Sequence, residues 1–304
     1  MRRAYHSRPR GAFTLVELLV VITILGILFA LTAAAVVRAI VKGDEVKSRN
    51  ELSQLTNAVK SFQNDFQVPY VPDTLALPPG NDQASAQFIT TLWPRLKGNG
   101  ALLANTATAR AYWQTGSQQR VLAGHQVLVF VLGGYREGAG ANGVGGDPAG
   151  FSSDATDPMK APVASAGRKG PYYEFPSERL KVISTTSDFP YPSFIDVYGK
   201  APYLYFSSST SGNDYPTTAV DLTYQTDTGA TGTFRVSPYL LRAASTGVTA
   251  KFANPTGFQI ISAGRDGRFG KGGINWGGGT GTADKDGYDD VANFHPTLLG
   301  IASN

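Results

Sequence analysis

The sequence predicts an α+β fold in which one long N-terminal helix packs on an antiparallel sheet with long loops. A helical pattern without proline runs through about residues 13–67, first apolar and then amphipathic. Short segments rich in β-branched and aromatic residues follow in the C-terminal half. With 35 Gly and 18 Pro among 304 residues, many loops and turns connect these elements.

The positive charge of the chain is concentrated at its N-terminus. The chain has 27 basic and 23 acidic residues, and four of the basic ones, Arg2, Arg3, Arg8 and Arg10, lie in residues 1–12, which contain no acid. The remaining 23 basic residues balance the 23 acidic ones, so the body lacks the positive field that nucleic-acid binding requires. The absence of cysteine excludes disulfides, thiolate metal sites and cysteine nucleophiles.

Residues 18–37 form a 20-residue segment without a charged side chain. A helix of that length covers about 30 Å, the thickness of the hydrocarbon layer of a membrane. The arginines before the segment and the mixed charges after it predict a cytoplasmic N-terminus, with the bulk of the chain across the membrane. Glu17 lies at the cytoplasmic edge, where a charge without a partner is costly, so we expect it to have a functional partner.

The stretch RGAFTLVELLVVI at residues 10–22 resembles the N-terminal signature of type IV pilins and type II secretion pseudopilins. The resemblance implies that residues 1–12 are a class III prepilin leader, which a prepilin peptidase removes between Ala12 and Phe13. Phe13 would then be N-methylated, and Glu17 would be the fifth mature residue. The family most often has glycine before the cut, so cleavage after Gly11 stays open and would make Glu17 the sixth residue.

The same resemblance implies a role for Glu17 in assembly. In this family the glutamate pairs with the methylated terminal amine of a neighbouring subunit as the filament forms. Two opposite charges that are each costly in a low dielectric favour the register that brings them together. Glu17 is therefore expected to be an assembly residue and not a catalytic acid.

The long helix is expected to have two halves, a transmembrane half at residues 13–37 and an amphipathic half at residues 38–68. The second half carries an apolar stripe at steps of three and four residues, made by Leu52, Leu55, Val59, Phe62 and Phe66. Such a stripe normally packs on the chain's own globular domain. Pro69 and Pro72 end the helix.

Residues 69–304 are expected to form one extracytoplasmic globular domain. Residues 86–93 and 101–114 predict short helices, and the apolar run 126–132 fits a buried helix or a buried strand. Residues 133–170 are rich in glycine and predict an exposed, partly mobile insertion. Strands are predicted at 180–185, 193–197, 203–207, 233–237 and 258–262.

Residues 260–294 contain the densest polar pattern. Ser262 and Asp266 precede a glycine-rich stretch, after which come the carboxylates of Asp284, Asp286, Asp289 and Asp290. Carboxylates at alternate positions are a common way to offer oxygen ligands to Ca²⁺. The spacing is not that of an EF-hand, because no glutamate closes the loop, and composition alone fits a solvated acidic loop equally well.

This segment is similar to the C-terminal calcium loop of type II secretion major pseudopilins, in the pattern S-x-G-x-D-G followed by D-V-x-N-F. The resemblance implies a Ca²⁺ site with Ser262, Asp266 and Asp290 as ligands, and with Asp284, Asp286 and Asp289 as alternatives. Residues 196–206 resemble another stretch of those proteins, with one extra residue before the proline. The chain is longer than the family's major subunits, which leaves a minor subunit or a variant open.

Sequence patterns for catalysis are weak. The motifs H-E-x-x-H and G-x-S-x-G and the P-loop are absent, and His125 beside an apolar run predicts a packing residue. A hydrolase with a pair of carboxylates stays open, because two acids distant in sequence can meet in the fold. The chain is therefore expected not to be an enzyme.

Together these features predict a structural subunit of a type II secretion pseudopilus, a helical homo-oligomeric filament. It would cross the inner membrane once and place its C-terminal domain in the periplasm. Prepilin peptidase, minor pseudopilins and the inner-membrane secretion platform are the implied partners, and no nucleic acid is expected. Two alternatives stay open, namely a type IV pilin for adhesion, motility or DNA uptake, and an extracytoplasmic binding or hydrolase domain anchored by a pilin leader.

Overall fold

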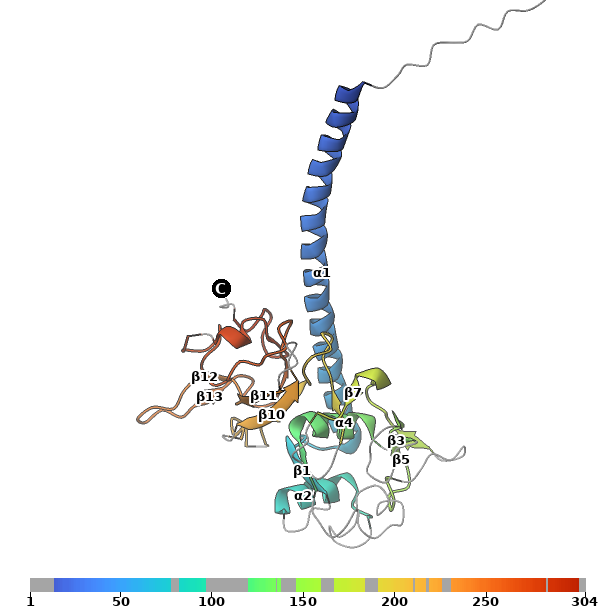
Figure 1. The fold of residues 1–304 in the computed structure, drawn as a ribbon. Coiled ribbons are helices and arrows are strands. Elements are labelled where there is room, and N and C mark those ends of the chain that lie inside the picture. The colour runs from blue at the N-terminus through green and yellow to red at the C-terminus, as the bar shows by residue number, and fades with distance from the viewer. Residues whose placement is uncertain are drawn as a thin grey trace, which may run out of the picture. The chain divides into compact units, whose positions relative to one another are not determined.

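The computed structural model describes residues 14–77, 82–96, 120–134, 136–137, 146–159, 167–183, 191–209, 211–216, 219–225, 231–282 and 284–300. The chain divides into two compact units, Met1–Asp44 and Glu45–Asn304. The α+β class predicted from the sequence is confirmed, since a long N-terminal helix is combined with antiparallel sheets (Figure 1). The predicted processing residues Gly11, Ala12 and Phe13 lie outside the described residues.

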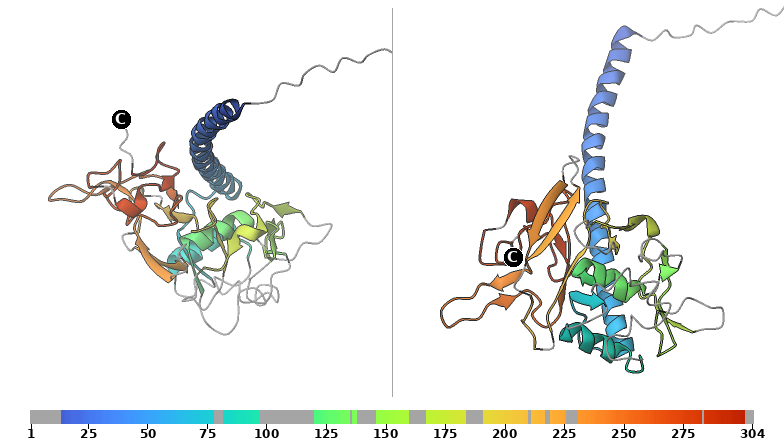
Figure 2. Two further views of the ribbon diagram at one scale, coloured as in Figure 1. Left: turned by 45° about the horizontal axis from the view of Figure 1, so that its top comes forward. Right: turned by 60° about the horizontal axis from the view of Figure 1, so that its bottom comes forward.

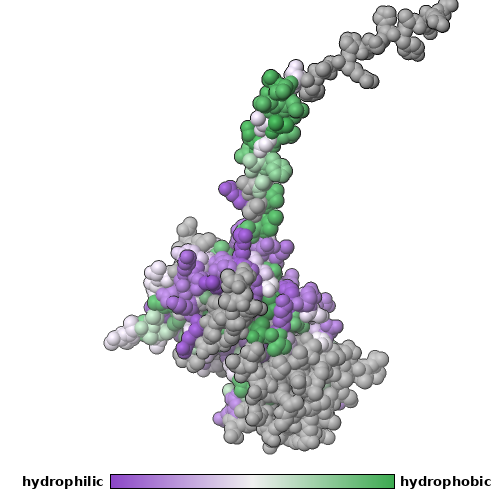
Figure 3. All heavy atoms as spheres, in the orientation of Figure 1, coloured by the Kyte–Doolittle hydropathy of each residue, from purple (hydrophilic) through white to green (hydrophobic). Residues whose placement is uncertain are grey.

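The described part of the first unit is the beginning of helix α1 (Leu15–Phe66). Its apolar side chains are exposed, with Leu15 and Phe29 at 79% and 78%, and they form a continuous apolar surface (Figure 3). Among the described residues, α1 is the one helix long and apolar enough to cross a membrane. The uncharged segment 18–37 lies entirely within this helix. Its 20 residues can therefore cross the hydrocarbon layer of a membrane as one continuous helix.

The second unit builds its main core on the remainder of α1. The apolar stripe predicted from the sequence is buried there, since Leu55, Val59 and Phe62 are all 0% exposed. Gln67 follows the helix with a positive φ of 54°, and Val68 donates its N–H to the carbonyl of Gln63 at 3.0 Å. The helix therefore ends just before Pro69, as predicted.

The remaining elements are short and are connected by long loops. In chain order they are β1 (Thr74–Leu77), α2 (Gln83–Leu92), β2 (Arg120–Ala123), α4 (Gly124–Gly133), β3 (Arg136–Glu137), β4 (Asp147–Pro148), β5 (Phe151–Ser152), β6 (Arg168–Lys169), the 3₁₀ helix η2 (Ser177–Arg179), β7 (Leu180–Lys181), β8 (Ser193–Phe194), β9 (Leu204–Ser207), β10 (Val220–Gln225), β11 (Thr231–Val236), β12 (Leu240–Arg242), β13 (Lys251–Phe252), β14 (Phe258–Ser262), the 3₁₀ helix η3 (Lys285–Gly287) and β15 (Val291–Ala292).

A three-stranded antiparallel sheet in the order β15–β14–β9 separates two hydrophobic cores. Alternate residues of a strand point to opposite faces, so Tyr205 and Ile260 contribute to the core that contains α1. Leu204, Phe206 and Ile261 contribute to a second core, built with the C-terminal segments. Because both faces of this sheet are covered, its strands are buried along their whole length.

Helix α4 resolves the ambiguity of the apolar run 126–132, which is a fully buried helix. It belongs to the same core as the C-terminal part of α1 (Figure 2). A helix with apolar residues on every side has no amphipathic period, so the sequence pattern could not separate it from a buried strand.

The expectation of an exposed insertion at 133–170 holds for described residues such as Asp147, Ser153 and Lys169, but it is wrong for Phe151 and Met159. Phe151 and Met159 are 1% and 0% exposed and belong to the main core. The Phe151 ring packs against Phe66 at 5.9 Å and Phe130 at 5.7 Å between ring centroids. The short β5–β6 pair carries Phe151 into this aromatic cluster, so a glycine-rich composition was a poor guide to exposure.

The predicted helix 86–93 is present as α2, whereas the predicted helix 101–114 lies outside the described residues. The predicted strands 203–207 and 258–262 correspond to β9 and β14, and 233–237 overlaps β11. The strands predicted at 180–185 and 193–197 are shorter than expected, with two residues each in β7 and β8. Strand β10 was not predicted, and it pairs with β11 in a two-stranded ribbon (Figure 2).

The carboxylate of Glu51, on α1, joins the helix to the rest of the second unit. Both guanidinium Nη atoms of Arg179 donate to it at 2.6 Å, and the hydroxyls of Tyr173 and Tyr203 donate to it at 3.1 and 2.5 Å. The Glu51 side chain is 11% exposed and that of Arg179 is 21% exposed. The Arg179 guanidinium also lies 4.3 Å from the ring centroid of Phe194. The carboxylate thus accepts four hydrogen bonds, two of them from a charged donor.

We expect Arg179→Met to lower the free energy of unfolding by about 3 kcal/mol, because it leaves the partly buried Glu51 carboxylate without its cation. Chemical denaturation of the purified protein measures the change. Arg265→Met is the matched control at an exposed position and should change stability by less than about 0.5 kcal/mol. Equal stabilities of the two variants would contradict a structural role for the Glu51–Arg179 pair.

Candidate functional sites

Thr14 and Glu17 form a capping box at the start of α1. The Glu17 amide donates to Thr14 Oγ1 at 3.2 Å, and the Thr14 amide donates to Glu17 Oε2 at 3.1 Å. The Thr14 hydroxyl also donates to Glu17 Oε2 at 3.0 Å. In this reciprocal arrangement each side chain satisfies a backbone donor that a helix start leaves unpaired.

The capping box gives Glu17 a second possible role, beside the pairing with a neighbouring subunit that the resemblance implies. The sequence analysis did not anticipate it, although the signal is local, a threonine followed three residues later by a glutamate. Both roles use the same carboxylate, and they differ in what they require. A cap needs an acceptor oxygen, whereas ionic pairing needs a negative charge.

The proposed calcium residues lie around the pairing of β14 with β15. In this register Ser262 is opposite Val291, which brings Asp290 close to the turn that follows β14. The Asp266 amide donates to Asp289 Oδ2 at 2.9 Å, so the two carboxylate-bearing segments are in direct contact. The close approach depends on Gly264, with φ at +67°, because a Cβ there would lie 2.2 Å from the Asp289 carbonyl oxygen.

Asp290 is the buried centre of this loop, at 0% exposure. Its Oδ2 accepts hydrogen bonds from the Tyr239 hydroxyl at 2.9 Å and from the Gly270 amide at 3.0 Å. Its Oδ1 has no hydrogen-bond partner among the described residues. Burial raises the pKa of Asp290 well above its usual value, and the nearby charges of Asp289 and Asp266 raise it further.

Asp266 shares this electrostatic environment. Its Oδ1 accepts the Arg268 amide at 2.7 Å. Burial raises the pKa of Asp266 to about 6, and the charges of Asp289 and Asp286 act in the same direction. The structure therefore brings Asp289 close enough to Asp266 and Asp290 for its charge to disfavour the ionisation of both.

The other predicted ligands have different partners. The Ser262 hydroxyl donates to Asp196 Oδ2 at 3.0 Å, and Asp284 Oδ2 accepts the Lys271 amide at 3.2 Å. Asp286 Oδ1 lies 4.0 Å from Arg268 Nη1. Within the described residues, no group of three or more histidine or acidic side chains is placed so that it could hold a metal ion.

Asp196, Tyr239 and Gly270 take part in this region although none was predicted as a site residue. Asp196 is fully buried and accepts from the Lys200 amide at 3.3 Å as well as from Ser262. Burial raises its pKa to about 6. Its position at the start of the 196–206 stretch was the available sequence signal, whereas nothing local marks Tyr239 as a partner of a residue 51 positions away.

His125 is a buried packing residue, as the sequence predicted, with 4% exposure. Its Nδ1 lies 2.7 Å from the hydroxyl oxygen of Ser193, which is 0% exposed. Burial lowers the pKa of His125 to about 4, so the ring is neutral at pH 7. The pair joins α4 to β8 inside the main core.

Comparison with known proteins identifies a family motif at the N-terminus of the chain. Residues 7–33 match the family model described as the prokaryotic N-terminal methylation motif. The chain therefore carries a type IV pilin-like prepilin leader, which supports the pilin superfamily. Together with the apolar start of α1, the motif is consistent with a single-pass, membrane-anchored protein. No curated protein and no solved structure matches the chain significantly.

Asp73 provides a pH test of the fold. Burial raises its folded-state pKa from 3.8 to about 6, although Oδ2 accepts the Ser207 amide at 3.2 Å. Its contribution to stability is therefore fully present below the unfolded pKa near 3.8, and it is lost as the pH rises through 6. We expect the difference in unfolding free energy, wild type minus Asp73→Asn, to fall by up to about 3 kcal/mol between pH 4 and pH 7.

Denaturation curves of both proteins at intervals of half a pH unit measure this difference. Asparagine keeps an acceptor oxygen for the Ser207 amide, so the comparison isolates the titration of the carboxyl group. A difference that is constant with pH, or that rises between pH 4 and pH 7, would contradict the raised pKa.

Proposed function

We propose that this protein is a structural subunit of a type II secretion pseudopilus. The observation that carries the proposal is the N-terminal methylation motif at residues 7–33, which overlaps the start of the long helix α1, where the apolar side chains are exposed. Exposed apolar side chains over so many turns of a helix need a lipid or protein environment. A membrane holds such a helix before assembly, and neighbouring helices cover it in a filament.

The proposed maturation begins on the cytoplasmic side of the membrane. Prepilin peptidase removes residues 1–12 between Ala12 and Phe13, and the new terminal amine of Phe13 is methylated. The arginine-rich leader holds the N-terminus in the cytoplasm, so residues 69–304 lie in the periplasm. Cleavage after Gly11 is the alternative register.

Assembly then depends on Glu17. Inserting a charged carboxylate into lipid costs about 2.5–3.5 kcal/mol on insertion scales, which favours a position where a positive charge meets it. The methylated amine of an adjacent subunit supplies that charge in the proposed filament. The minor pseudopilins and the inner-membrane secretion platform are the further proposed partners.

The choice of a pseudopilus over a type IV pilus rests on three features. The chain lacks cysteine, its body beyond residue 12 has balanced charge, and residues 196–206 and 260–294 resemble pseudopilin segments. A neutral body also disfavours DNA uptake. Because the chain is longer than the family's major subunits, a minor subunit is a form of the same proposal.

We also propose that the protein is not an enzyme. The Ser193–His125 pair has the residue types of a catalytic dyad, but both side chains are buried in the main core, where substrate cannot reach them. A leader-anchored binding or hydrolase domain would remain in the membrane, whereas a pseudopilus subunit would be recovered in filaments released when the outer membrane is disrupted. Recovery in filaments sheared from the surface of intact cells would instead favour a type IV pilus.

Mass spectrometry of the mature protein is the first test, using cells that contain the native prepilin peptidase. We expect the N-terminal peptide to begin with N-methylated Phe13. An intact Met1 would contradict processing, and a terminus at Ala12 would shift the cleavage register by one residue.

Two variants then separate the roles of Glu17 in filament assembly. Glu17→Gln keeps an acceptor for the capping box but removes the charge, whereas Thr14→Ala removes the cap and keeps the charge. If ionic pairing drives assembly, Glu17→Gln should be absent from filaments released from the periplasm and Thr14→Ala should be present. The reverse result would assign Glu17 to the helix start and would overturn the pairing role.

We further propose that the acidic loop binds Ca²⁺ through Asp290, Asp266 and Asp289. The residues fit a hard cation in two respects. Asp290 Oδ1 is a buried acceptor without a hydrogen-bond partner among the described residues, and the charge of Asp289 helps to raise the pKa values of Asp266 and Asp290. Among the described residues no three such side chains are placed to hold a metal ion, so binding requires these carboxylates to move together, and backbone carbonyls complete the shell. A bound cation would neutralise the repulsion within the loop.

Calcium is expected to raise the melting temperature of the wild-type protein. At a free Ca²⁺ concentration 100 times Kd, the gain is about 2.7 kcal/mol, or roughly 5–10 °C. Asp290→Asn should abolish this gain. In chelator it should melt no lower than wild type, because the amide removes a buried carboxylate without changing its shape. The control Asp214→Asn changes an exposed carboxylate outside the loop and should respond to Ca²⁺ as wild type does. An unchanged melting temperature of the wild type in Ca²⁺ would overturn the site.

A further inference from the structure

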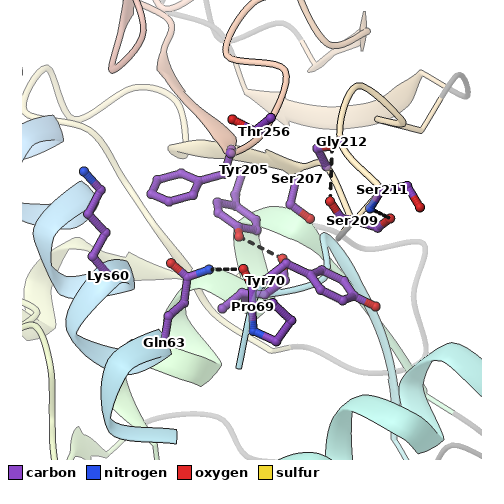
Figure 4. Close-up of a pocket in the computed structure, with 14 residues that line it drawn as sticks. Lys60, Gln63, Pro69, Tyr70, Tyr205, Ser207, Ser209, Ser211, Gly212 and Thr256 are labelled. Atoms are coloured by element: carbon purple, nitrogen blue, oxygen red, sulfur yellow. Dashed lines mark hydrogen bonds between the residues drawn. The ribbon is translucent and has the colours of Figure 1, made fainter. Parts of the chain in front are cut away.

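A cavity of about 410 Å³ lies in the second unit, between α1 and the segments that follow β9 and precede β14. Lys60 and Gln63 line it from α1, and Ser209, Ser211 and Gly212 line it from the segment after β9, with Tyr70 and Tyr205 between them (Figure 4). Its volume falls in the range typical of small-molecule sites. It is separate from both the N-terminal motif and the acidic loop.

Hydrogen bonds within the protein fix the walls of this cavity. The Tyr205 hydroxyl donates to the Val71 carbonyl at 2.9 Å, and Gln63 Nε2 donates to the Pro69 carbonyl at 3.1 Å (Figure 4). The ring of Tyr205 packs against that of Phe258 with 5.7 Å between centroids. A site with walls already ordered loses little entropy when a ligand binds.

The serine-bearing wall is also held in place. The Ser208 hydroxyl donates to Asp214 Oδ1 at 2.6 Å, the Ser209 amide donates to the same oxygen at 2.8 Å, and the Ser209 hydroxyl donates to Asp214 Oδ2. The Ser211 amide donates to Ser209 Oγ at 3.2 Å. The Asp214 carboxylate is thus engaged with its own segment, while the exposed hydroxyls of Ser211 and Thr256 remain at the cavity.

Lys60 is the one charged side chain among the residues lining the cavity. It is exposed and makes no ion pair within the described part of the chain. Hydroxyls, one amide oxygen and one ammonium group form a lining that complements a ligand with many hydroxyls and one negative charge. An ammonium group binds a carboxylate more strongly than a neutral donor does.

We propose that this cavity binds an acidic saccharide, with the sugar carboxylate at Lys60 and the ring hydroxyls at Gln63, Ser211 and Thr256. A peptide strand fits less well, because β14 is paired on both edges and Gly124 of α4 packs against the Tyr205 carbonyl of β9. The inference does not rest on the proposed role in secretion.

Isothermal titration tests this on the full-length protein in a detergent without a sugar headgroup. The ligand is trigalacturonate, and galactotriose is its neutral counterpart, which differs at the C6 carboxylates. We expect trigalacturonate to bind with an affinity at least about tenfold higher than that of galactotriose. This is the factor expected when one charge-assisted hydrogen bond is lost. Lys60→Gln should lower the affinity for trigalacturonate by a similar factor.

Lys181→Gln is the matched control, since Lys181 is exposed and lies outside the cavity, and it should bind as wild type does. Thr256→Val should weaken both saccharides, because it removes a hydroxyl and keeps the shape of the side chain. No binding of either saccharide, or equal affinity for both, would overturn the proposal. Displacement of trigalacturonate by an equal concentration of tri-aspartate would assign the cavity to acidic peptides instead and would overturn it too.

Discussion

The fold of the second unit depends on how the carboxylate of Glu51 is accommodated. Glu51 lies on the face of α1 that packs against the globular part, where an uncompensated charge would be costly. Arg179 and the hydroxyls of Tyr173 and Tyr203 provide four donors to this carboxylate. These donors come from η2, from the segment before η2 and from the residue before β9, so Glu51 connects all three to the helix. Because these hydrogen bonds are directional, a shift of α1 relative to the rest of the second unit would break them, which favours the observed register.

The three-stranded sheet fixes the relative position of the two hydrophobic cores. Because β9 and β14 are buried on both faces, their alternate side chains serve two cores at once, and a shift of one residue would exchange them. The half-buried carboxylate of Asp73 and the fully buried carboxylate of Asp196 accept hydrogen bonds from the ends of these strands, at Ser207 and Ser262. Each fixes a strand end to a neighbouring loop. Burial raises the pKa of both carboxyl groups to about 6. Above that pH both are ionised in the folded protein, and their burial then lowers its stability.

The sequence predicted those parts of the fold that local pattern determines. The stripe on α1, the end of the helix before Pro69 and strands β9 and β14 follow from periodicity and turn residues, and the structure agrees with each. Helix α4 and Phe151 show where local pattern fails. A wholly buried helix has no polar face to reveal its period, and one aromatic residue can bring a glycine-rich segment into the core. For the site, the sequence identified the acidic loop, but Tyr239 is brought to Asp290 only by tertiary folding.

The carboxylates of the chain differ in how far the protein satisfies them. Asp290 lies in a closed position where burial disfavours the charge, and among the described residues its side chain accepts two hydrogen bonds, both at Oδ2. At the start of α1, the Thr14 amide and hydroxyl both donate to Glu17 Oε2, and no bond from a described residue is seen at Oε1. An acid that is fully satisfied, such as Glu51, defines a fold, because any rearrangement loses its partners. An acid that is only partly satisfied has acceptor capacity left for something outside its own segment, and in this chain the two positions that the sequence marked, Glu17 and Asp290, are of that second kind.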